Sequence, residues 1–396
     1  MAERRRWTIL AVGTFAQTAT CSFLYGIPML VPALRQHDGV SLFGASLLVS
    51  APIVGLLLTL IAWGALADRY GERVVIVIGV GVAGVLLAVL PFMSPLSLLA
   101  VVLALAGASA ASVNAASGRV VMGWFPARER GLAMGTRQTA QPLGVAVAAL
   151  VLPSLGHTHG ARDALLFPAG LCLLAAVLVL VLVRDPARPP REAGSSASRS
   201  PYRASWTLPR VHLASAMLVV PQFAVATFAL VYLVGQRGWE PAVAGRWIFA
   251  FQVAGAAGRI AAGVWSDRVA SRLGPIRQLA IMSAALMGLI ALGAFVDQWW
   301  VVIGFALGAV VTVADNGLAY TAVAEIAGVS WSGRALGVQN TVQNLAAVAT
   351  APMLAAVIGD SRYALAFVVT ALFPLIAIPL VPVRRAATEN PVAVRP

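Results

Sequence analysis

Twelve apolar runs, each about as long as a membrane-spanning helix, constrain this chain more than any other feature of its sequence. A helix needs about 20 consecutive apolar residues to cross the ~30 Å hydrocarbon core of a bilayer. Six such runs precede a polar segment and six follow it, at residues 8–34, 41–66, 74–93, 96–122, 131–154, 163–183, 211–235, 243–265, 277–296, 299–325, 334–358 and 362–383. We therefore predict an all-α membrane protein of twelve transmembrane helices that has the lipid bilayer as its solvent.

The composition excludes several other classes of protein. Charged residues make up 11% of the chain, whereas a soluble domain carries about 25% because its surface faces water. The net charge of +13 comes from arginines in short segments between the apolar runs. Because these arginines do not interleave with aromatic residues on one polar face, we expect no nucleic-acid partner.

The sequence also lacks the motifs of ATP-driven or enzymatic chemistry. It contains no phosphate-binding P-loop, no HExxH zinc motif and no GxSxG nucleophile elbow. Both cysteines, Cys21 and Cys172, fall inside apolar runs, and the histidines are too few to suggest a metal cluster. We therefore expect no enzyme activity, no metal and no cofactor.

The polar segment 184–210 divides the chain into two halves. It contains Pro189-Pro190, a stretch of glycine and serine, and six arginines, so it lacks the apolar surface that would order it. We predict a six-helix half at 1–183, a flexible cytoplasmic linker at 184–210 and a second six-helix half at 211–396.

The arginines also predict the orientation. With an even number of spans both termini lie on one side of the membrane, and that side carries most of the arginines: Arg4, Arg5, Arg6, Arg69, Arg73, Arg128, Arg130, Arg268, Arg272, Arg277, Arg334, Arg384 and Arg385. By the positive-inside rule this side is cytoplasmic. We expect a multi-pass protein of the plasma (cytoplasmic) membrane, monomeric, with both termini inside.

The two halves repeat each other in sequence. The segment from Gly64 to Arg73 follows the second span, and a degenerate copy from Gly263 to Arg272 follows the eighth. The segments 131–141 and 333–343 open the fifth and eleventh spans in the same way. A parallel repeat of this kind predicts two pseudo-symmetric six-helix bundles around a site at the membrane midplane.

The first of these segments resembles the signature loop between helices 2 and 3 of the major facilitator superfamily, G-x-x-x-D-[RK]-x-G-[RK]-[RK]. Glu72 stands where a basic residue is usual. The resemblance implies a secondary active transporter that works by alternating access. It implies gating roles for the matching residues Gly64, Asp68, Arg69, Gly71 and Arg73 and for their counterparts Asp267 and Arg268. Arg119 lies near the cytoplasmic end of span 4, and its position there suggests a gate or interface group.

Two further stretches resemble particular branches of this superfamily. The segment 118–131 is similar to the end of helix 4 in organic-anion and cyanate-type permeases, and 255–267 is similar to helix 8 of monocarboxylate and oxalate carriers. In the latter, the helix-8 arginine binds the substrate carboxylate. The resemblance assigns that role to Arg259 and implies a small organic anion as the substrate.

Three ionisable residues lie at membrane depth, where a charge costs at least ~2.5 kcal/mol. Arg259 precedes Asp267 by eight residues and so lies about 12 Å inside the cytoplasmic boundary, where its guanidinium suits a carboxylate. Arg137 is a second candidate for the substrate, or else it bonds helix-4 carbonyls. Asp315 is a candidate for proton coupling, or else forms a permanent ion pair with Arg259 or Arg137.

Neutral polar residues complete the predicted substrate site. They belong to spans 1, 4, 5, 7, 8, 10 and 11, and they are Tyr25, Asn114, Gln141, Gln222, Tyr232, Gln252, Tyr320, Gln339 and Asn340. The leading hypothesis is proton-linked symport of a small organic anion. Proton-driven efflux of amphipathic drug-like compounds, and a non-transporting receptor or scaffold, stay open.

The predicted orientation has a direct test. Cysteines introduced at Ser196, in the linker, and at Ser361, between the last two spans, are labelled from outside in intact cells with a membrane-impermeant maleimide. We expect reaction at Ser361→Cys alone, because positive-inside places the linker in the cytoplasm. The reverse pattern would reject the orientation.

Overall fold

The structure, a computed structural model, describes residues 2–40, 42–93, 95–185, 200–328, 330–358 and 362–383. Residues 186–199, with Ser196, and residues 359–361, with Ser361, lie outside the described residues, as do Arg384 and Arg385. The described chain is helical and has no strand. Eleven helical segments in it are long and apolar enough to cross a membrane.

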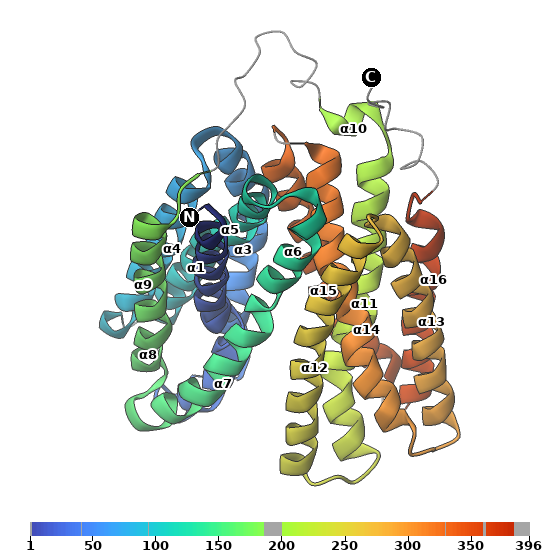
Figure 1. The fold of residues 1–396 in the computed structure, drawn as a ribbon. Coiled ribbons are helices and arrows are strands. Elements are labelled where there is room, and N and C mark those ends of the chain that lie inside the picture. Colours follow the sequence, from blue (N-terminus) through green and yellow to red (C-terminus); the bar gives the residue numbers. More distant parts are fainter. Residues whose placement is uncertain are drawn as a thin grey trace, which may run out of the picture. The chain divides into compact units, whose positions relative to one another are not determined.

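Each of the twelve predicted runs lies on helix, so the all-α fold is confirmed (Figure 1). The helices before the linker are α1 (Ala2–Leu24), η1 (Ile27–Leu30), α2 (Val31–Gln36), α3 (Leu42–Tyr70), α4 (Glu72–Ala88), η2 (Leu90–Phe92), α5 (Leu96–Trp124), η3 (Ala127–Glu129), α6 (Arg130–Gln138), α7 (Ala140–His159), α8 (Ala161–Ala164) and α9 (Leu166–Leu182). Those after it are α10 (Pro201–Ala204), α11 (Thr207–Gly235), α12 (Pro241–Arg268), α13 (Leu273–Phe295), α14 (Val301–Ala327), α15 (Ser332–Ile358) and α16 (Tyr363–Leu380).

One predicted span differs from a single helix in an instructive way. The run 131–154 is divided into α6 and α7 at Thr139, whose backbone N–H donates to the carbonyl of Thr136. Pro142 lacks the N–H that would bond the carbonyl of Gln138, and its ring crowds that carbonyl. The aligned position of the second half, Asn344, has an N–H, and α15 runs through it unbroken.

The chain forms two compact units. Unit 1 comprises Met1–Pro126, Thr136–Ser198 and Ala327–Thr341; unit 2 comprises Ala127–Gly135, Arg199–Ile326 and Val342–Pro396. The first turns of α6 therefore belong to unit 2, and the first turns of α15 belong to unit 1. These two segments are the pair that the sequence repeat aligns.

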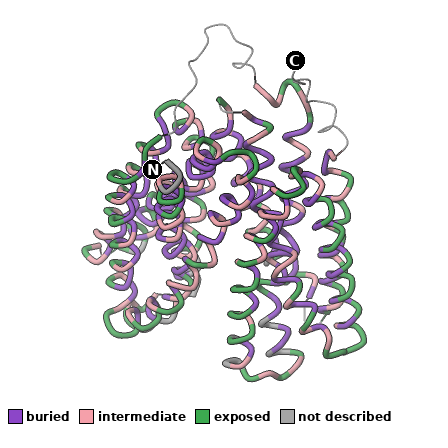
Figure 2. Tube along the Cα trace, in the orientation of Figure 1, coloured by how far each residue is buried: buried purple, intermediate pink, exposed green. Residues whose placement is uncertain are grey.

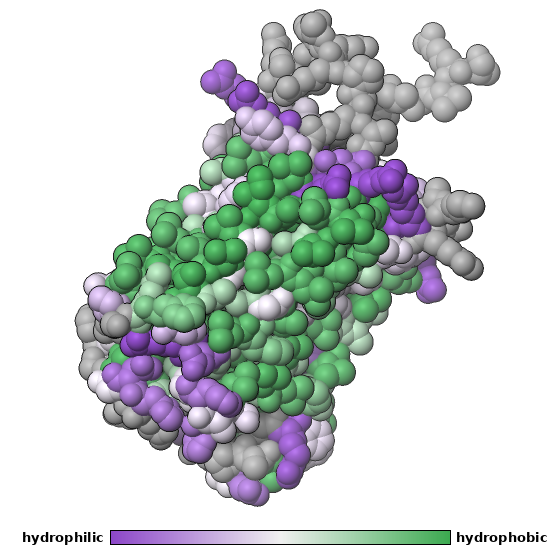
Figure 3. Space-filling view, turned by 90° about the vertical axis from the view of Figure 1, so that its left-hand side faces the viewer, coloured by the Kyte–Doolittle hydropathy of each residue, from purple (hydrophilic) through white to green (hydrophobic). Residues whose placement is uncertain are grey.

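Each unit has an apolar interior, and many large apolar side chains are also exposed on its surface. Unit 1 is packed around Phe23, Leu48 and Leu103, and unit 2 around Met287 and Phe305. Buried and exposed residues alternate along the helices at helical spacing (Figure 2). Figure 3 shows apolar side chains over most of one face, with hydrophilic ones gathered toward its two ends. A surface of this kind suits a hydrocarbon core between two polar interfaces.

The repeated loops turn through positive φ angles. Gly71, between α3 and α4, has φ 101° and ψ 161°, a region that only glycine adopts readily. The glycine of the signature loop therefore occupies a backbone conformation that favours glycine. The aligned residue between α12 and α13 is Ala270, with φ 49°, where a Cβ costs about 1 kcal/mol.

We therefore expect opposite responses to exchanging these two residues. Gly71→Ala should destabilise the folded protein by about 1–3 kcal/mol and lower its melting temperature. Ala270→Gly should raise the melting temperature, because it removes the strain of the positive φ. The increase should be slight, because glycine loses more chain entropy on folding than alanine does. Thermal unfolding of the purified variants measures both, and an unchanged Gly71→Ala variant would contradict the first expectation.

Candidate functional site

Asp68, at the end of α3 in unit 1, holds the first turn of α15. Its side chain is 2% exposed. Oδ1 accepts a hydrogen bond from the Gly333 N–H at 2.9 Å, and Oδ2 accepts one from the Arg334 N–H at 3.1 Å. The first N–H groups of a helix have no partner within the helix, and its N-terminal dipole favours a negative charge. Asp68 thus caps α15 from another helix.

Glycines permit this approach of the two helices. A Cβ on Gly64 would collide with the Gly333 carbonyl, and one on Gly333 would come within 2.6 Å of Asp68 Oδ1. Gly337, one turn further along α15, packs in the same way on the backbone of Leu60 and Ile61. The signature glycine therefore sits where close helix contact requires it.

The arginine beside Asp68 is Arg119 of α5. Its Nη1 lies 2.7 Å from Asp68 Oδ1. Arg69 and Arg73, the arginines of the signature loop itself, make other contacts. Arg73 donates its backbone N–H to Asp185 Oδ1 at 2.8 Å, and the guanidinium of Arg69 lies over the Tyr70 ring. Adjacency in sequence does not reveal the partner, because Arg69 in the last turn of α3 and Arg73 in the first turn of α4 both make their contacts elsewhere.

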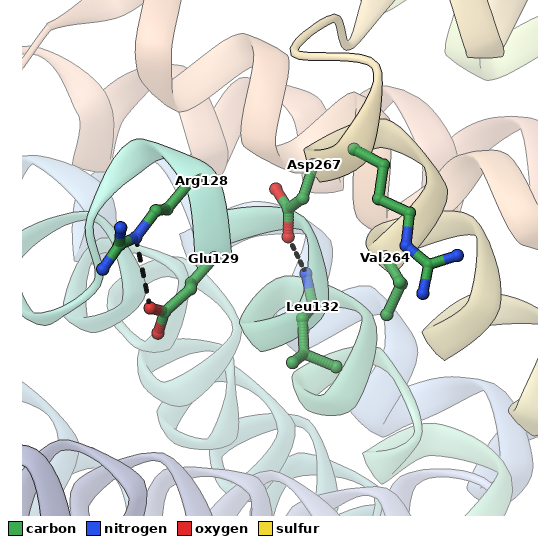
Figure 4. Close-up of a pocket in the computed structure, with 6 residues that line it drawn as sticks. Arg128, Glu129, Leu132, Val264 and Asp267 are labelled. Atoms are coloured by element: carbon green, nitrogen blue, oxygen red, sulfur yellow. Dashed lines mark hydrogen bonds and ion pairs between the residues drawn. The ribbon is translucent and has the colours of Figure 1, made fainter.

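Asp267, at the end of α12 in unit 2, makes the matching contacts with α6 (Figure 4). It accepts hydrogen bonds from the Gly131 N–H at 2.9 Å and the Leu132 N–H at 2.8 Å. A Cβ on Gly263 would collide with the Gly131 carbonyl. A pocket of about 210 Å³ lies beside these contacts, lined by Arg128, Glu129, Leu132, Val264, Asp267 and Arg268.

The arginine of this second cluster comes from a different element. Arg272 Nη1 lies 2.6 Å from Asp267 Oδ1, and Arg272 Nε lies 3.4 Å from Glu325 Oε2. When Gly131 is aligned with Gly333, the residue that matches Arg119 is Thr321. The two units therefore build the same helix-capping contact with arginines that are not repeat equivalents.

Arg137, in the last turn of α6, is 1% exposed and belongs to unit 1. Nε donates to Ser117 Oγ at 2.7 Å, Nη2 to the Asn114 carbonyl at 2.9 Å and Nη1 to Gln138 Oε1 at 2.7 Å. These acceptors are neutral, so they orient the guanidinium without cancelling its charge. The contact with a helix-4 carbonyl is the alternative that the sequence left open for Arg137.

An asparagine and a glutamine pair in each unit. In unit 1, Gln17 Nε2 donates to Asn114 Oδ1 at 3.1 Å. In unit 2, Asn316 Nδ2 donates to Gln222 Oε1 at 2.8 Å. Asn114 and Asn316 are repeat equivalents. Sequence reasoning named Asn114 and Gln222 but not the pairing, whose signal is an asparagine at the same place in both repeats.

The eleventh span, α15, contributes one residue to each of these two polar networks. Asn340 Nδ2 donates to the Asn114 carbonyl at 3.3 Å within unit 1. Gln343 Nε2 donates to Asn316 Oδ1 at 3.1 Å and to Ser215 Oγ at 2.6 Å within unit 2. Three predicted polar residues, Asn114, Gln222 and Asn340, therefore serve at least partly to hold helices together.

Arg259 and Asp315 are buried in unit 2, with 5% and 2% of their surfaces exposed. Arg259 is the charged group that interacts electrostatically with Asp315. Asp315 Oδ2 makes no hydrogen bond to any described residue. The repeat equivalents of the two residues are the apolar Leu60 and Val113, so neither charge belongs to the shared framework of the halves.

Small residues surround this pair. A Cβ on Gly255 of α12 would lie 2.5 Å from the Ala309 carbonyl of α14, and one on Gly258 would meet Val310. On another side, a Cβ on Gly135 of α6 would lie 2.6 Å from the Arg259 carbonyl. The backbones of three helices of unit 2 thus approach one another closely beside Arg259.

The remaining predicted residues lie in different environments. Tyr320 is buried on α14, one turn beyond Asn316, and Gln339 is fully buried on α15. Gln252 is exposed on α12, while Tyr25 and Gln141 are half-buried. Tyr232 packs in the aromatic core of unit 2, where its ring makes edge-to-face contacts with Phe305, Tyr363 and Phe367.

The chain is similar in sequence to membrane transporters. An uncharacterized MFS-type transporter of Mycobacterium tuberculosis is 43% identical over 380 residues, covering 96% of this chain and 85% of that protein. The probable galactarate/D-glucarate transporter GudP of Escherichia coli is 23% identical over 275 residues, covering 61% of each chain.

Solved structures share the fold. The human organic anion transporter MFSD10 aligns with a TM-score of 0.74 and 17% identity, over 96% of this chain and 99% of that one. The proton:xylose symporter XylE aligns with a TM-score of 0.75 and 16% identity, over 96% and 95%.

The family assignment rests on the sequence itself. The sequence model of the Major Facilitator Superfamily matches residues 10–351 and 213–396 in two overlapping stretches, and the relative at 43% identity spans nearly the whole chain. With its membrane-length helices, this chain is a multi-pass membrane protein and a secondary transporter rather than an enzyme, and it belongs to the Major Facilitator Superfamily.

Proposed function

We propose that this transporter moves a small organic anion by alternating access, coupled to protons, as a monomer in the cytoplasmic membrane with both termini inside. The observation that carries the proposal is the buried pair Arg259 and Asp315 in unit 2. An ionisable group at membrane depth needs a partner of opposite charge or a functional reason. Arg259 and Asp315 interact with each other, so each has a partner of opposite charge. Their repeat equivalents are uncharged, so the fold does not require this pair and a functional reason is needed as well.

Arg259 has the chemistry for a carboxylate. Its planar guanidinium offers donors in a fork that matches two carboxylate oxygens. Its burial strengthens any such contact, because the local dielectric constant inside the protein is lower than in water. GudP, a probable galactarate/D-glucarate transporter, is a relative at 23% identity, and its named solutes are carboxylates. That name supports an anionic substrate for this chain.

Asp315 has the placement for the coupled proton. While it is ionised, it offsets the charge of Arg259. A substrate anion at Arg259 would compete with it, and protonation of Asp315 removes that competition. Its Oδ2 makes no hydrogen bond to a described residue, so a proton there displaces no existing contact.

Other predicted residues enter as supporting members of the substrate site. Arg137 is buried in unit 1 and oriented by hydrogen bonds to Ser117, Asn114 and Gln138, and its guanidinium has the chemistry to bind an anion. We include with it, as proposed contacts to substrate, the polar residues Tyr25, Asn114, Gln141, Gln222, Tyr232, Gln252, Tyr320, Gln339 and Asn340.

We assign gating to the two helix-capping clusters. Asp68 with Arg119 holds the first turn of α15, and Asp267 with Arg272 holds the first turn of α6. Breaking either contact releases a helix end, which is what a conformational change at this end of the fold requires. Gly64, Arg69, Gly71, Arg73 and Arg268 belong to the same loops.

Efflux of amphipathic compounds is the alternative function. It would need an aromatic, apolar substrate site, and the aromatic residues that suggested one are Phe223, Phe228, Trp247 and Phe251. Phe228 and Phe251 are buried in the core of unit 2, where they pack against other side chains. This packing favours the anion over the amphipathic compound.

Asp315→Asn tests proton coupling. In proteoliposomes, D-glucarate accumulation driven by a pH gradient should be lost in Asp315→Asn, because the amide does not titrate. Counterflow exchange of D-glucarate, which needs no net proton movement, should continue. The same substitution at the exposed Asp163 serves as the control. Concentrative uptake that persists in Asp315→Asn would assign this carboxylate a structural role.

Arg259→Gln tests the anion site. Calorimetric binding of D-glucarate to the purified protein should weaken by about 30-fold or more, the effect of removing one partner of a buried charge pair. Arg259→Lys should also bind weakly, because it keeps the charge and loses the fork. Arg246→Gln, on the exposed side of α12, should bind normally.

The same measurement separates the competing substrate classes. D-Xylose and tetraphenylphosphonium, a lipophilic cation, are titrated beside D-glucarate. Full affinity for D-glucarate in Arg259→Gln would contradict the anion site. Binding of tetraphenylphosphonium in place of D-glucarate would support efflux.

A further inference from the structure

Glu72 is a buried carboxyl at the first position of α4, where the superfamily's signature loop has a basic residue. Its side chain is 0% exposed. Its Oε1 lies 2.7 Å from Arg119 Nε, yet neither carboxyl oxygen makes a hydrogen bond of good geometry to a described residue. A carboxylate so placed is poorly solvated, which disfavours its ionised form.

Arg119 is shared between two carboxyl groups. Its Nε faces Glu72, and its Nη1 lies 2.7 Å from Asp68 Oδ1. One positive charge cannot neutralise both carboxyls when both are ionised. Because Asp68 also caps the α15 amides, it gains more than Glu72 does from being ionised.

A third carboxyl adds repulsion. Asp185, just after α9, interacts electrostatically with Glu72. The nearby arginines are Arg73, whose Nε donates to the Leu180 carbonyl at 3.1 Å, and the half-buried Arg334, whose Nε lies 3.8 Å from Asp68 Oδ2. Neither arginine pairs with Glu72 in these contacts. Glu72 thus faces one shared cation and two anions.

Among the residues that the structure describes, unit 2 shows no counterpart of this arrangement. Aligning Asp68 with Asp267 pairs Glu72 with Ser271, a neutral residue. The Asp267 cluster is instead completed by Glu325, which is 27% exposed and therefore hydrated. A buried titratable group beside the helix-capping aspartate is peculiar to unit 1.

We propose that Glu72 binds a proton at neutral pH and that this proton controls the grip of Asp68 on the first turn of α15. With Glu72 protonated, Arg119 serves Asp68 alone, and the Glu72 hydroxyl can donate to the Asp185 carboxylate. When the proton leaves, Glu72 draws on Arg119 and repels Asp68 and Asp185. The first turn of α15 is then released more often, so the gate opens more readily as cytoplasmic pH rises.

The proposal concerns the gate that we assigned to the Asp68 cluster, and it is tested without any substrate. Ser332, the buried first residue of α15, is changed to Cys in a Cys21→Ala, Cys172→Ala background. The purified protein in nanodiscs is alkylated with a maleimide between pH 6 and pH 8. Each rate is divided by that of Ala204→Cys, an exposed position on α10, which removes the pH dependence of the thiol itself.

In the otherwise unchanged background, the normalised rate should rise by about tenfold over these two pH units, following the ionised fraction of one carboxyl. Glu72→Gln, an isostere of the protonated form, should hold the low rate at every pH. Asp185→Asn should shift the rise to lower pH, because removing a like charge makes Glu72 easier to ionise. A role in packing alone predicts no such shift.

Asp163→Asn, at an exposed carboxyl of α8, is the control and should leave the profile unchanged. If Glu72→Gln does not fold, the shift in Asp185→Asn still decides the question. Profiles for Glu72→Gln or Asp185→Asn that coincide with the unchanged background would overturn the proposal. Transport of D-glucarate is measured separately, so its loss or retention does not bear on this result.

Discussion

A buried polar group needs a hydrogen-bond partner within the protein, and this constraint governs the structure from the membrane core to the buried helix ends. Helices answer it for the backbone, except at their first N–H groups, which need partners from elsewhere. Asp68 and Asp267 supply those partners for α15 and α6 from the ends of other helices. The same constraint explains the glycines around them, because a carboxylate reaches a neighbouring helix end only when the two backbones nearly touch.

The two units meet this requirement with one geometry and different residues. The aspartates and glycines recur at aligned positions, but the guanidinium comes from α5 in unit 1 and from the loop after α12 in unit 2. The Asn114–Gln17 and Asn316–Gln222 pairs behave likewise, with the asparagine fixed and the donor reversed. The repeat therefore preserves the position of one carboxylate or amide in each half. The residue that completes the contact differs between the two halves.

Much of the fold follows from the sequence because apolar runs and charge patterning are local properties. The twelve apolar runs are recognised from stretches of neighbouring residues. A glycine between two such runs, as at Gly71, suggests a turn, and the polar side chain of Asn114 is evident from the sequence itself. The hydropathy of the run 131–154 does not reveal the helix break at Thr139. The local signal for this break is Pro142, which cannot donate a hydrogen bond to the Gln138 carbonyl. Pairings between distant residues were missed for a different reason. Nothing near Asp68 indicates that Arg119 reaches it from α5, and nothing near Tyr232 indicates that it faces Phe305 and Tyr363 in the core.

Departures from the repeat are the informative part of such a molecule. A residue present in both halves is explained by the framework that both halves must build, as Gly64 and Gly263 are. Arg119, a buried charge present in only one half, is explained by the capping contact that it completes, whereas Arg259, Asp315, Arg137 and Glu72 take no part in a contact that both halves build. Their aligned partners are Leu60, Val113, Gln339 and Ser271, so the fold manages without a charge at each place. Since every buried charge opposes folding into a membrane, its retention in one half points to work that the framework does not do: binding an anion, carrying a proton, or timing the release of a helix.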